Sequence, residues 1–395
     1  MKKDIKKIAI IYSGGKHFGG IETYLLSLFE LYPGDEVDLT LLSLGNWELT
    51  KQLRGEGYEV KAFSGSRIRP QTIGEIRQYL VDGGYDLVIS QGTVANAYAR
   101  AVSYFSKIPN LVTVHSDPYF DYPNPLVRGI YIAIERITAR QTKRYIAVSQ
   151  YLKKLIVQDG VSESKIKVIY NGVSLPSPSS LRGTKLSSTL GHSSEDWNPD
   201  ISDGPVEGDP RIRKDDNKIV IGSVGRLHAV KGYHNLITAL SLLANDKIEL
   251  RIAGSGGEKE PLSDLAKKLG VSKQVNFLGY IEPEKIPDFL SGLDIYIQPS
   301  LAEGFGLSVV EAMIAGKPVI VTPVGSLPEI VEDGKTGVVT DGTSPESLAV
   351  AIRPLFADVG VRHDIAKAGQ KYASTHFSTS EWIDETVSVY LEAAK

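Results

Sequence analysis

Residues 303–311 read Glu-Gly-Phe-Gly-Leu-Ser-Val-Val-Glu, so two carboxylates flank a short glycine-rich segment. The residues before it, 293–300, are mostly β-forming and end at Pro299-Ser300. The residues after it, 307–315, are apolar on nearly every helical face and are followed by Gly316-Lys317-Pro318. This order predicts a strand, a glycine loop and a buried helix that Gly and Pro terminate.

Such a segment is suited to bind an anion and the groups on either side of it. Gly304 and Gly306 let the backbone approach a ligand closely, and unpaired amides at a helix start favour negative charge. Glu303 precedes the expected helix and Glu311 lies within it, roughly 10 Å away at a rise of about 1.5 Å per residue. Carboxylates so far apart cannot act on one bond, but they can hold the two ends of an elongated ligand. A nucleotide-sugar, with hydroxyls at both ends and phosphates between them, has this form.

The composition is that of a soluble globular protein, with 42% hydrophobic and 23% charged residues. Its 395 residues are enough for two domains. No apolar run approaches the roughly 18 residues that span a bilayer, and residues 8–12 are too few for a signal-peptide core and predict a first strand. The chain has no cysteine, which excludes disulfides, thiolate metal sites and a cysteine nucleophile and agrees with a cytoplasmic location.

Short β-rich segments alternate with helical patterns twice along the chain. In the first half the expected strands are residues 7–12, 37–42, 86–90, 111–115, 145–148 and 167–170. In the second half they are residues 218–224, 248–253, 275–278, 294–298 and 318–321. Such alternation predicts a parallel sheet covered on both faces, and its repetition predicts two doubly wound α/β domains. Because ligands bind at the carboxyl ends of such strands, we expect the site in a cleft between the domains.

The domain boundaries follow from this rhythm. The N-terminal domain is expected at residues 1–173 and the C-terminal domain at 218–375. Residues 174–217, rich in Ser, Pro, Gly and Asp, predict a linker or surface excursion because few of them could build a core. Residues 376–395 contain an amphipathic helix that is a candidate to pack back on the N-terminal domain.

The chain resembles the retaining glycosyltransferases of family 4, which have the two-domain GT-B architecture. In the second half the resemblance rests on Gly225-Arg226-Leu227, Lys231-Gly232, Ala253-Gly254-Ser255-Gly256, Phe277-Leu278-Gly279, residues 303–311 and Gly325-Ser326-Leu327-Pro328-Glu329. In the first half it rests on Gly19-Gly20-Ile21-Glu22, His115, Ser149 and Asn171-Gly172-Val173. The resemblance implies two Rossmann-like domains that face a central cleft, with the acceptor on the first and the nucleotide-sugar on the second.

The resemblance also implies roles for four charged residues. Arg226 and Lys231 would hold the donor diphosphate and stabilise the charge that develops on it as it leaves. Glu311 would bind the ribose hydroxyls, and Glu303 would bind the transferred sugar. The alternatives are solvated loop charges for the two cations and a buried structural ion pair for Glu311.

Further site residues come from the loops around the cleft. The backbone amides of Phe305, Gly306 and Leu307 are expected to meet the sugar and phosphate, and the segment at Gly279 is expected to receive the base. Gly19 and Gly20 do not give the dinucleotide pattern G-x-G-x-x-G, and the resemblance places them against the donor phosphates and the acceptor. Glu22 is expected to cap the helix that starts there.

His115 and Ser149 follow two of the expected strands. A lone histidine at a strand end is usually structural, whereas the resemblance implies that His115 hydrogen-bonds the transferred sugar or the acceptor. Ser149 is a candidate cleft residue, and Asn171-Gly172 first of all predicts a turn.

The implied reaction is retaining and metal-independent, from a nucleoside-diphosphate sugar to an acceptor hydroxyl. A UDP-sugar is favoured, a GDP-sugar is second, and no cofactor or nucleic acid is expected. The cleft elements contain no D-x-D motif, and the seven histidines do not pair at ligand spacing. The alternatives are a nucleotide-sugar epimerase or a phosphorylase on the same architecture, or a non-catalytic nucleotide-sugar-binding protein. Retention of Arg226, Lys231, Glu303 and Glu311 together favours the transferase.

Charge suggests where the acceptor binds. Residues 1–175 hold 22 Lys and Arg against 17 Asp and Glu, whereas the remainder holds 22 against 30. Within residues 128–144, a single helix would carry Arg136, Arg140, Lys143 and Arg144 on one side, beside apolar residues. This pattern predicts peripheral contact with the inner face of an anionic membrane and a lipid-linked acceptor, as in bacterial polysaccharide or glycolipid assembly. The alternative is a packed helix with a solvated basic face.

Overall fold

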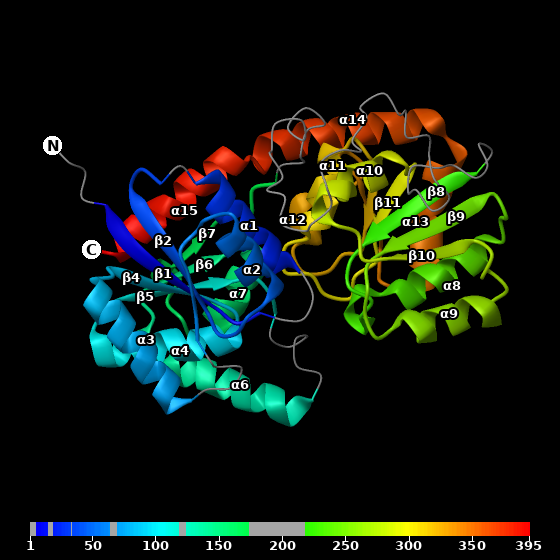
Figure 1. The fold of residues 1–395 in the computed structure, drawn as a ribbon. Coiled ribbons are helices and arrows are strands. Elements are labelled where there is room, and N and C mark those ends of the chain that lie inside the picture. Colours follow the sequence, from blue (N-terminus) through cyan, green and yellow to red (C-terminus); the bar gives the residue numbers. More distant parts are fainter. Residues whose placement is uncertain (1–4, 15–18, 33, 64–68, 118–123, 174–217) are drawn as a thin grey trace, which may run out of the picture.

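The computed structural model describes residues 5–14, 19–32, 34–63, 69–117, 124–173 and 218–395. The chain forms two α/β domains that lie side by side, and each has one parallel sheet with helices on both faces (Figure 1). This confirms the predicted fold class. The expected linker at residues 174–217 lies outside the described residues.

The first domain is built on a seven-stranded sheet with the order β3-β2-β1-β4-β5-β6-β7. Its strands are β1 (Lys6–Tyr12), β2 (Val37–Ser43), β3 (Val60–Ala62), β4 (Leu87–Gln91), β5 (Asn110–Val114), β6 (Arg144–Ala147) and β7 (Ile166–Val168). Its helices include α1 (Gly20–Leu31), α2 (Glu48–Gly55), α3 (Pro70–Gly83), α4 (Thr93–Ser106), α6 (Pro125–Thr138) and α7 (Gln150–Gln158). The strand order reverses at β1 and β4, and Tyr12 at the end of β1 lies opposite Ser43 and Gln91. A crevice is expected at the carboxyl end of such a reversal.

The second domain repeats this design with a six-stranded sheet, β10-β9-β8-β11-β12-β13. Its strands are β8 (Ile219–Val224), β9 (Ile248–Ala253), β10 (Val275–Gly279), β11 (Ile295–Gln298), β12 (Val319–Val321) and β13 (Val338–Val339). Its helices are α8 (Tyr233–Leu243), α9 (Lys259–Lys268), α10 (Ile286–Ser291), α11 (Leu307–Ile314), α12 (Leu327–Ile330), α13 (Pro345–Ala357) and α14 (Val359–His376). The strand order reverses here at β8 and β11, so both sheets offer a crevice to a ligand.

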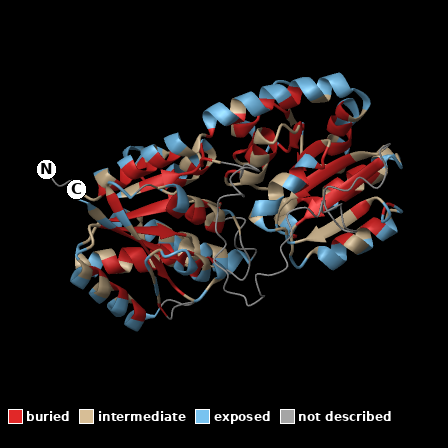
Figure 2. Cartoon of the chain, turned by 45° about the horizontal axis from the view of Figure 1, so that its top comes forward, coloured by how far each residue is buried: buried red, intermediate tan, exposed pale blue. Residues whose placement is uncertain are grey.

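All eleven strands expected from the sequence are present, with ends that differ by one or two residues. They are recognisable because helices cover both faces of each sheet, which makes the strands almost continuously apolar. Figure 2 shows the buried strands inside a layer of half-exposed helices. The sequence pattern missed β3 and β13, since three and two residues are too few for a periodic signal.

The last helix, α15 (Thr379–Ala393), lies on the first domain, whereas α14 before it lies on the second (Figure 1). Its Trp382, Val387 and Tyr390 are buried in the same core as residues of β1 and α1. The chain after β7 passes tightly against its start, because a Cβ at Gly172 would lie only 2.6 Å from the Thr379 Cα. The C-terminal residues therefore complete the core of the N-terminal domain.

The expectation of one basic helix across residues 128–144 is wrong. Helix α6 ends at Thr138, Arg140 lies in a short 3-10 turn, and Arg144 already belongs to β6. The reason is that Tyr145, Ile146 and Ala147 are buried in the sheet, so the helix must stop before them. The cations thus do not form one helical face.

Candidate active site

Residues expected at the site come together where the two domains meet. Gly304, at the glycine loop before α11, packs so closely on the His115 carbonyl that a side chain there would not fit. Ser149 Oγ donates a hydrogen bond of 2.9 Å to the Gly304 carbonyl, and Gly20 lies beside Leu307. The carboxyl ends of β5 and β6 and the start of α1 thus face the glycine loop and the start of α11 across the interface.

The central polar contact joins Lys231 to Glu303. Lys231 Nζ lies 2.7 Å from Glu303 Oε2, and the two side chains are only 17% and 13% exposed. The same carboxylate oxygen accepts a hydrogen bond of 3.1 Å from Ser300 Oγ. Lys231 is held by a tight turn, in which Gly232 has φ 67° and packs on the Pro299 carbonyl. The cation expected on the phosphate and the carboxylate expected on the sugar are therefore neighbours.

A line of polar side chains behind Glu303 was missed by sequence reasoning. Tyr296 OH donates to Gln298 Oε1 at 2.8 Å, and Gln298 Nε2 donates to Ser300 Oγ at 2.8 Å. Ser308 Oγ, in the first turn of α11, also donates to Gln298 Oε1 at 3.2 Å. Because residues at spacing two share a face of a strand, the polar series 296, 298 and 300 was the signal for this network. It orients Ser300 and through it the Glu303 carboxylate.

Arg226 lies next to this pair, on the loop after β8. The loop is fixed by backbone packing, since Gly254 has φ 140° and fits closely against the Gly225 carbonyl. The Leu227 amide also donates to the Ser255 carbonyl at 2.9 Å. A Cβ at Gly225 would lie 3.5 Å from the Lys231 Cε, so the two cations flank one glycine. Arg226 itself is exposed, and no described residue forms an ion pair with it.

Glu311 lies on α11, one helix turn beyond the glycine loop. Burial raises the pKa of its carboxyl to about 7. Among the described residues we find no ion pair to its carboxylate, so the alternative of a structural ion pair has no support there. A half-buried carboxyl with no donor among the residues that the structure describes can accept hydrogen bonds from the hydroxyl groups of a ligand.

The glycine loop offers backbone rather than side chains to a ligand. Gly306 has φ 95° and lies at the N-cap of α11, where the first amides of the helix have no partner within the helix. The Phe305 ring is only 4% exposed and packs edge-to-face on Phe377, with centroids 5.7 Å apart. Phe305 can therefore contribute only its backbone. On the opposite side of the domain's crevice, Gly279 ends β10 with φ 76° and accepts a hydrogen bond of 2.6 Å from the Gly254 amide.

His115 follows β5 on the first domain. Its Nε2 is hydrogen-bonded to Gln91 Oε1, and its ring meets Tyr24 edge-to-face at 4.6 Å between centroids. Burial lowers the pKa of His115 to about 3, so the imidazole is neutral at physiological pH. A neutral ring of such low basicity can hydrogen-bond a sugar but is a weak acceptor of protons.

Two other first-domain residues have structural partners. Ser149 is fully buried and caps α7, because the Leu152 amide donates to its Oγ at 3.2 Å. Glu22 caps α1 as expected. Its carboxylate accepts a hydrogen bond of 2.9 Å from the Gly19 amide and one of 2.6 Å from Tyr12 OH. Gly19 and Gly20 thus form the start of α1, directly at the domain interface.

Glu329, the last residue of the Gly325–Glu329 motif, joins the domains. Its carboxylate accepts hydrogen bonds from the amides of Gln150 at 2.8 Å and Tyr151 at 2.6 Å. Tyr170 OH donates to it at 3.0 Å. A carboxylate of the second domain thus caps helix α7 of the first, which no local sequence pattern could indicate.

Two further properties concern metals and membranes. Within the described ranges, no three His, Asp or Glu side chains gather as they would to hold a metal ion. None of the helices described is long and apolar enough to cross a bilayer.

Comparisons with known proteins agree with this geometry. The model of the group 1 glycosyl transferases matches residues 207–372, and that of glycosyltransferase family 4 matches residues 18–176. An uncharacterised glycosyltransferase of Methanocaldococcus jannaschii is 31% identical over 322 residues, 78% of this chain and 75% of the relative. A Klebsiella pneumoniae protein, described only as an uncharacterised 41.2 kDa protein in the cps region, is 28% identical over 311 residues, 78% of each chain.

A similar solved structure is that of Anabaena HepE in complex with UDP and glucose. It superposes with a TM-score of 0.79 at 22% identity and covers 98% of this chain and 100% of that one, which shows the shared fold. The two family models and the Methanocaldococcus relative together show the family of this chain. The chain belongs to the group 1 and family 4 glycosyltransferases, enzymes of the GT-B architecture.

Proposed function

We propose that this glycosyltransferase is retaining and moves a sugar from a nucleoside-diphosphate sugar to an acceptor hydroxyl without a metal ion or other cofactor. A UDP-sugar is the favoured donor, and a GDP-sugar is the second choice. The observation that carries the proposal is the 2.7 Å contact of Lys231 with Glu303, beside the α11 start and close to His115. HepE, which shares the fold, binds UDP and glucose.

In this proposal Arg226, Lys231 and the first amides of α11 receive the diphosphate. Two cations and a helix start neutralise the charge that grows on the leaving group, which is the task of a divalent ion in other transferases. Turnover should therefore persist in excess EDTA. Complete loss that magnesium restores would contradict metal independence.

The retaining outcome is part of this proposal, and the contacts of Glu303 support it. Glu303 is held by Lys231 and Ser300, an arrangement suited to hydrogen-bond a sugar hydroxyl rather than to attack carbon. The acceptor hydroxyl would approach the anomeric carbon from the face of the leaving group. The bond from carbon to phosphate oxygen breaks, a bond to the acceptor oxygen forms, and the acceptor proton passes to the leaving phosphate.

The rival functions can be separated without knowing the acceptor. UDP-glucose or GDP-mannose is incubated with the protein alone, and the products are followed by proton NMR. Slow release of a free sugar whose first-formed anomer keeps the donor configuration supports a retaining transferase. A second nucleotide-sugar would indicate an epimerase, and binding without any product would indicate a binding protein.

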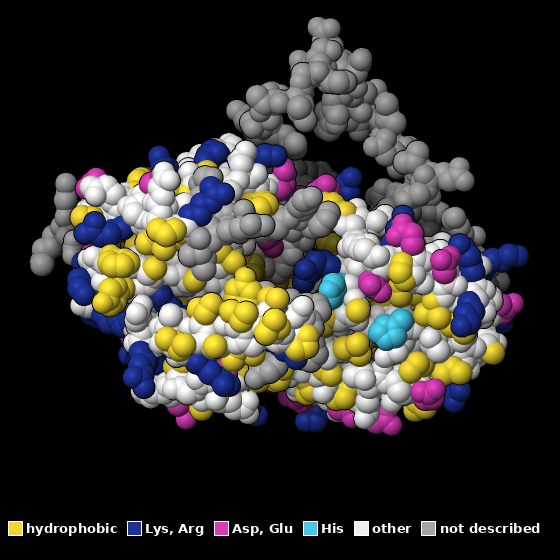
Figure 3. All heavy atoms as spheres, turned by 90° about the horizontal axis from the view of Figure 1, so that it is seen from below, with side chains coloured by type: hydrophobic (Ala, Val, Ile, Leu, Met, Phe, Trp, Pro, Cys, Tyr) yellow, Lys and Arg dark blue, Asp and Glu magenta, His cyan; other side chains and the backbone are white. Residues whose placement is uncertain are grey.

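We further propose a lipid-linked acceptor, used in polysaccharide or glycolipid assembly at the inner face of a membrane. The supporting feature is a stripe on the outer face of α6, where Leu126, Ile130, Ile134 and Ile137 are 74%, 53%, 37% and 77% exposed. Figure 3 shows apolar side chains gathered on the side of the molecule where α6 lies.

This membrane contact is tested by sedimentation with anionic and neutral vesicles at physiological salt. We expect binding to anionic vesicles that Ile130→Ser with Ile137→Ser abolishes, because the two changes remove two exposed apolar side chains from the stripe. Val350→Ser is the control, since Val350 is 60% exposed on the second domain. Absence of sedimentation with either vesicle would favour a soluble acceptor.

A further inference from the structure

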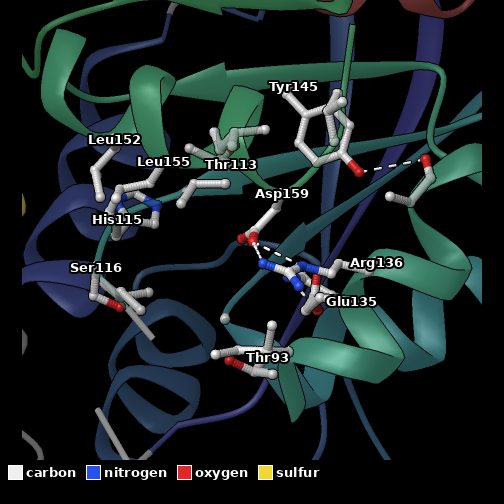
Figure 4. Close-up of a pocket in the computed structure, with 18 residues that line it drawn as sticks. Thr93, Thr113, His115, Ser116, Glu135, Arg136, Tyr145, Leu152, Leu155 and Asp159 are labelled. Atoms are coloured by element: carbon white, nitrogen blue, oxygen red, sulfur yellow. Dashed lines mark hydrogen bonds and ion pairs between the residues drawn. The ribbon is translucent and has the colours of Figure 1, made fainter. Parts of the chain in front are cut away.

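A second feature of the first domain is a pocket that begins at the proposed site and runs beneath α6 (Figure 4). His115 and Ser116 line one end of it, at the carboxyl edge of β5. The space enclosed in the pocket is about 90 Å³, several times the roughly 10–15 Å³ that one buried water requires. None of the donor-binding residues of the second domain lines it.

The walls of the pocket are mainly apolar. They are formed by α6, the 3-10 turn after it, and α7, with a lining that includes Ile132, Ala139, Leu152, Leu155, Ile156 and Val161. In the close-up, Leu152 and Leu155 lie beside His115, whereas Glu135, Arg136 and Asp159 lie farther along. A free sugar needs hydrogen-bonding partners for its hydroxyl groups, and mainly apolar walls do not supply them along their length.

Helix α6 covers this space without filling it. None of its described side chains is buried, although its neighbours α4 and α7 both have buried faces. It is attached instead by ion pairs, from Glu135 to the buried Arg100 at 2.8 Å and from Arg136 to Asp159 at 2.7 Å. The helix is thus held in place by charges while apolar surface beneath it stays available.

We infer that this pocket receives the apolar chain of the acceptor, an amphiphilic alcohol whose hydroxyl end lies at His115. The inference rests on the proposed transferase function and names the class of its acceptor. Its physical basis is that the pocket is continuous with the proposed site, because His115 belongs to both. Arg136 and Asp159 pair with each other at the far end of the pocket, where the Arg136 side chain is half-exposed, so that end needs no charged partner from a ligand. Burying an apolar chain there is favourable because it removes apolar surface from water.

The outer stripe of α6 fits the same occupant. Ile130 and Ile132 lie two positions apart on the helix, with Ile130 in the exposed stripe and Ile132 in the pocket wall. A lipid that leaves a membrane at the outer face would therefore meet apolar surface on both sides of one helix. These two isoleucines also supply a matched pair for a test.

The probes are octyl β-glucoside below its micellar concentration and methyl β-glucoside, which has the same head without the chain. We expect octyl β-glucoside to raise the Tm of the wild-type protein by about 2–4 °C and methyl β-glucoside to leave it unchanged. Ile132→Trp, which fills the pocket, should abolish the rise, and Ile130→Trp should keep it. If Ile132→Trp does not fold, Ala139→Leu fills the same pocket with a smaller change.

Three outcomes would overturn the inference. They are equal shifts with both glucosides, an unchanged shift in the filled variants, and a shift lost in Ile130→Trp but kept in Ile132→Trp. Stabilisation by UDP is measured on the same proteins and should be unaffected in every variant. A protein that UDP does not stabilise would speak against the proposed donor, whatever octyl β-glucoside does, so the two failures are distinguishable.

Discussion

The two sides of the cleft are built in different ways. On the second domain, glycines at 232, 254, 256 and 325 pack backbone against backbone and hold the turns that carry Arg226, Lys231 and Glu303. On the first domain, α6 has no buried residue and stands over an apolar pocket. The side proposed to bind the donor is therefore specified by local backbone geometry, whereas the side proposed to bind the acceptor is shaped by how whole helices pack. Such a division allows one donor chemistry to serve different acceptors.

The largest effect that we expect is the loss of turnover when Lys231 is removed. Lys231→Ala should lower turnover by about 10²-fold or more, because the departing diphosphate loses a preorganised cation. Lys335→Ala is the control, since Lys335 is 76% exposed and pairs only with Glu332 on its own loop. Donor turnover is measured for both, with circular dichroism to verify folding. Near-normal turnover of Lys231→Ala would take the residue out of the mechanism.

The second prediction separates the two carboxylates on the side proposed to bind the donor. Glu311→Ala should weaken binding of UDP itself by about tenfold or more, because a ribose hydroxyl bond to a charged group is lost. Glu303→Ala should leave UDP binding within about twofold while impairing transfer, since it contacts the sugar. Calorimetric titration with UDP and a turnover assay on both variants give the comparison. Equal losses for both ligands in both variants would contradict the assignment to opposite ends.

The third prediction concerns pH and Glu311. Binding to ribose hydroxyls favours the ionised carboxylate, and burial raises the pKa of this group to about 7. Affinity for UDP-glucose should be highest above pH 7 and should fall by up to about tenfold per unit below it. The free energy of unfolding should depend on pH in the opposite direction. A raised pKa of an acid stabilises the fold at low pH, and that contribution is lost as pH rises through 7. Glu311→Gln should remove both dependences, and an affinity profile that it leaves unchanged would exclude Glu311 as the titrating group.

The smallest effect that we expect concerns Glu329, which links the second domain to the first. Glu329→Ala removes the acceptor of three hydrogen bonds from the first domain. We expect a loss of about 1–3 kcal/mol in unfolding free energy and a larger radius of gyration by small-angle scattering. Glu332→Ala is the control, because Glu332 pairs with Lys335 at the surface. Unchanged scattering and stability in Glu329→Ala would mean that the contact does not hold the domains together.

Much of the fold could be predicted because its signals are local. The strands stood out as apolar runs between helical patterns, and Glu22 as a cap three residues after Gly19. The prediction failed at residues 128–144, where helical spacing continued in the sequence but burial of Tyr145 and Ile146 ended the helix. The charged residues of the site were named from motifs, yet Ser300 and Gln298 beside Glu303 were not, since they act only through side-chain contacts.

The sequence by itself determined the two parallel sheets, the glycine loop before α11 and the positions of the cations and carboxylates along the chain. These features depend on the spacing of apolar residues and on the residue types that form turns, and both act over only a few residues. Only the tertiary structure decided that Lys231 pairs with Glu303, that Glu329 caps a helix of the other domain, and that α6 covers an apolar pocket. Those contacts join residues 72 or more positions apart or follow from the packing of separate helices. Their energy depends on distances that no local pattern encodes.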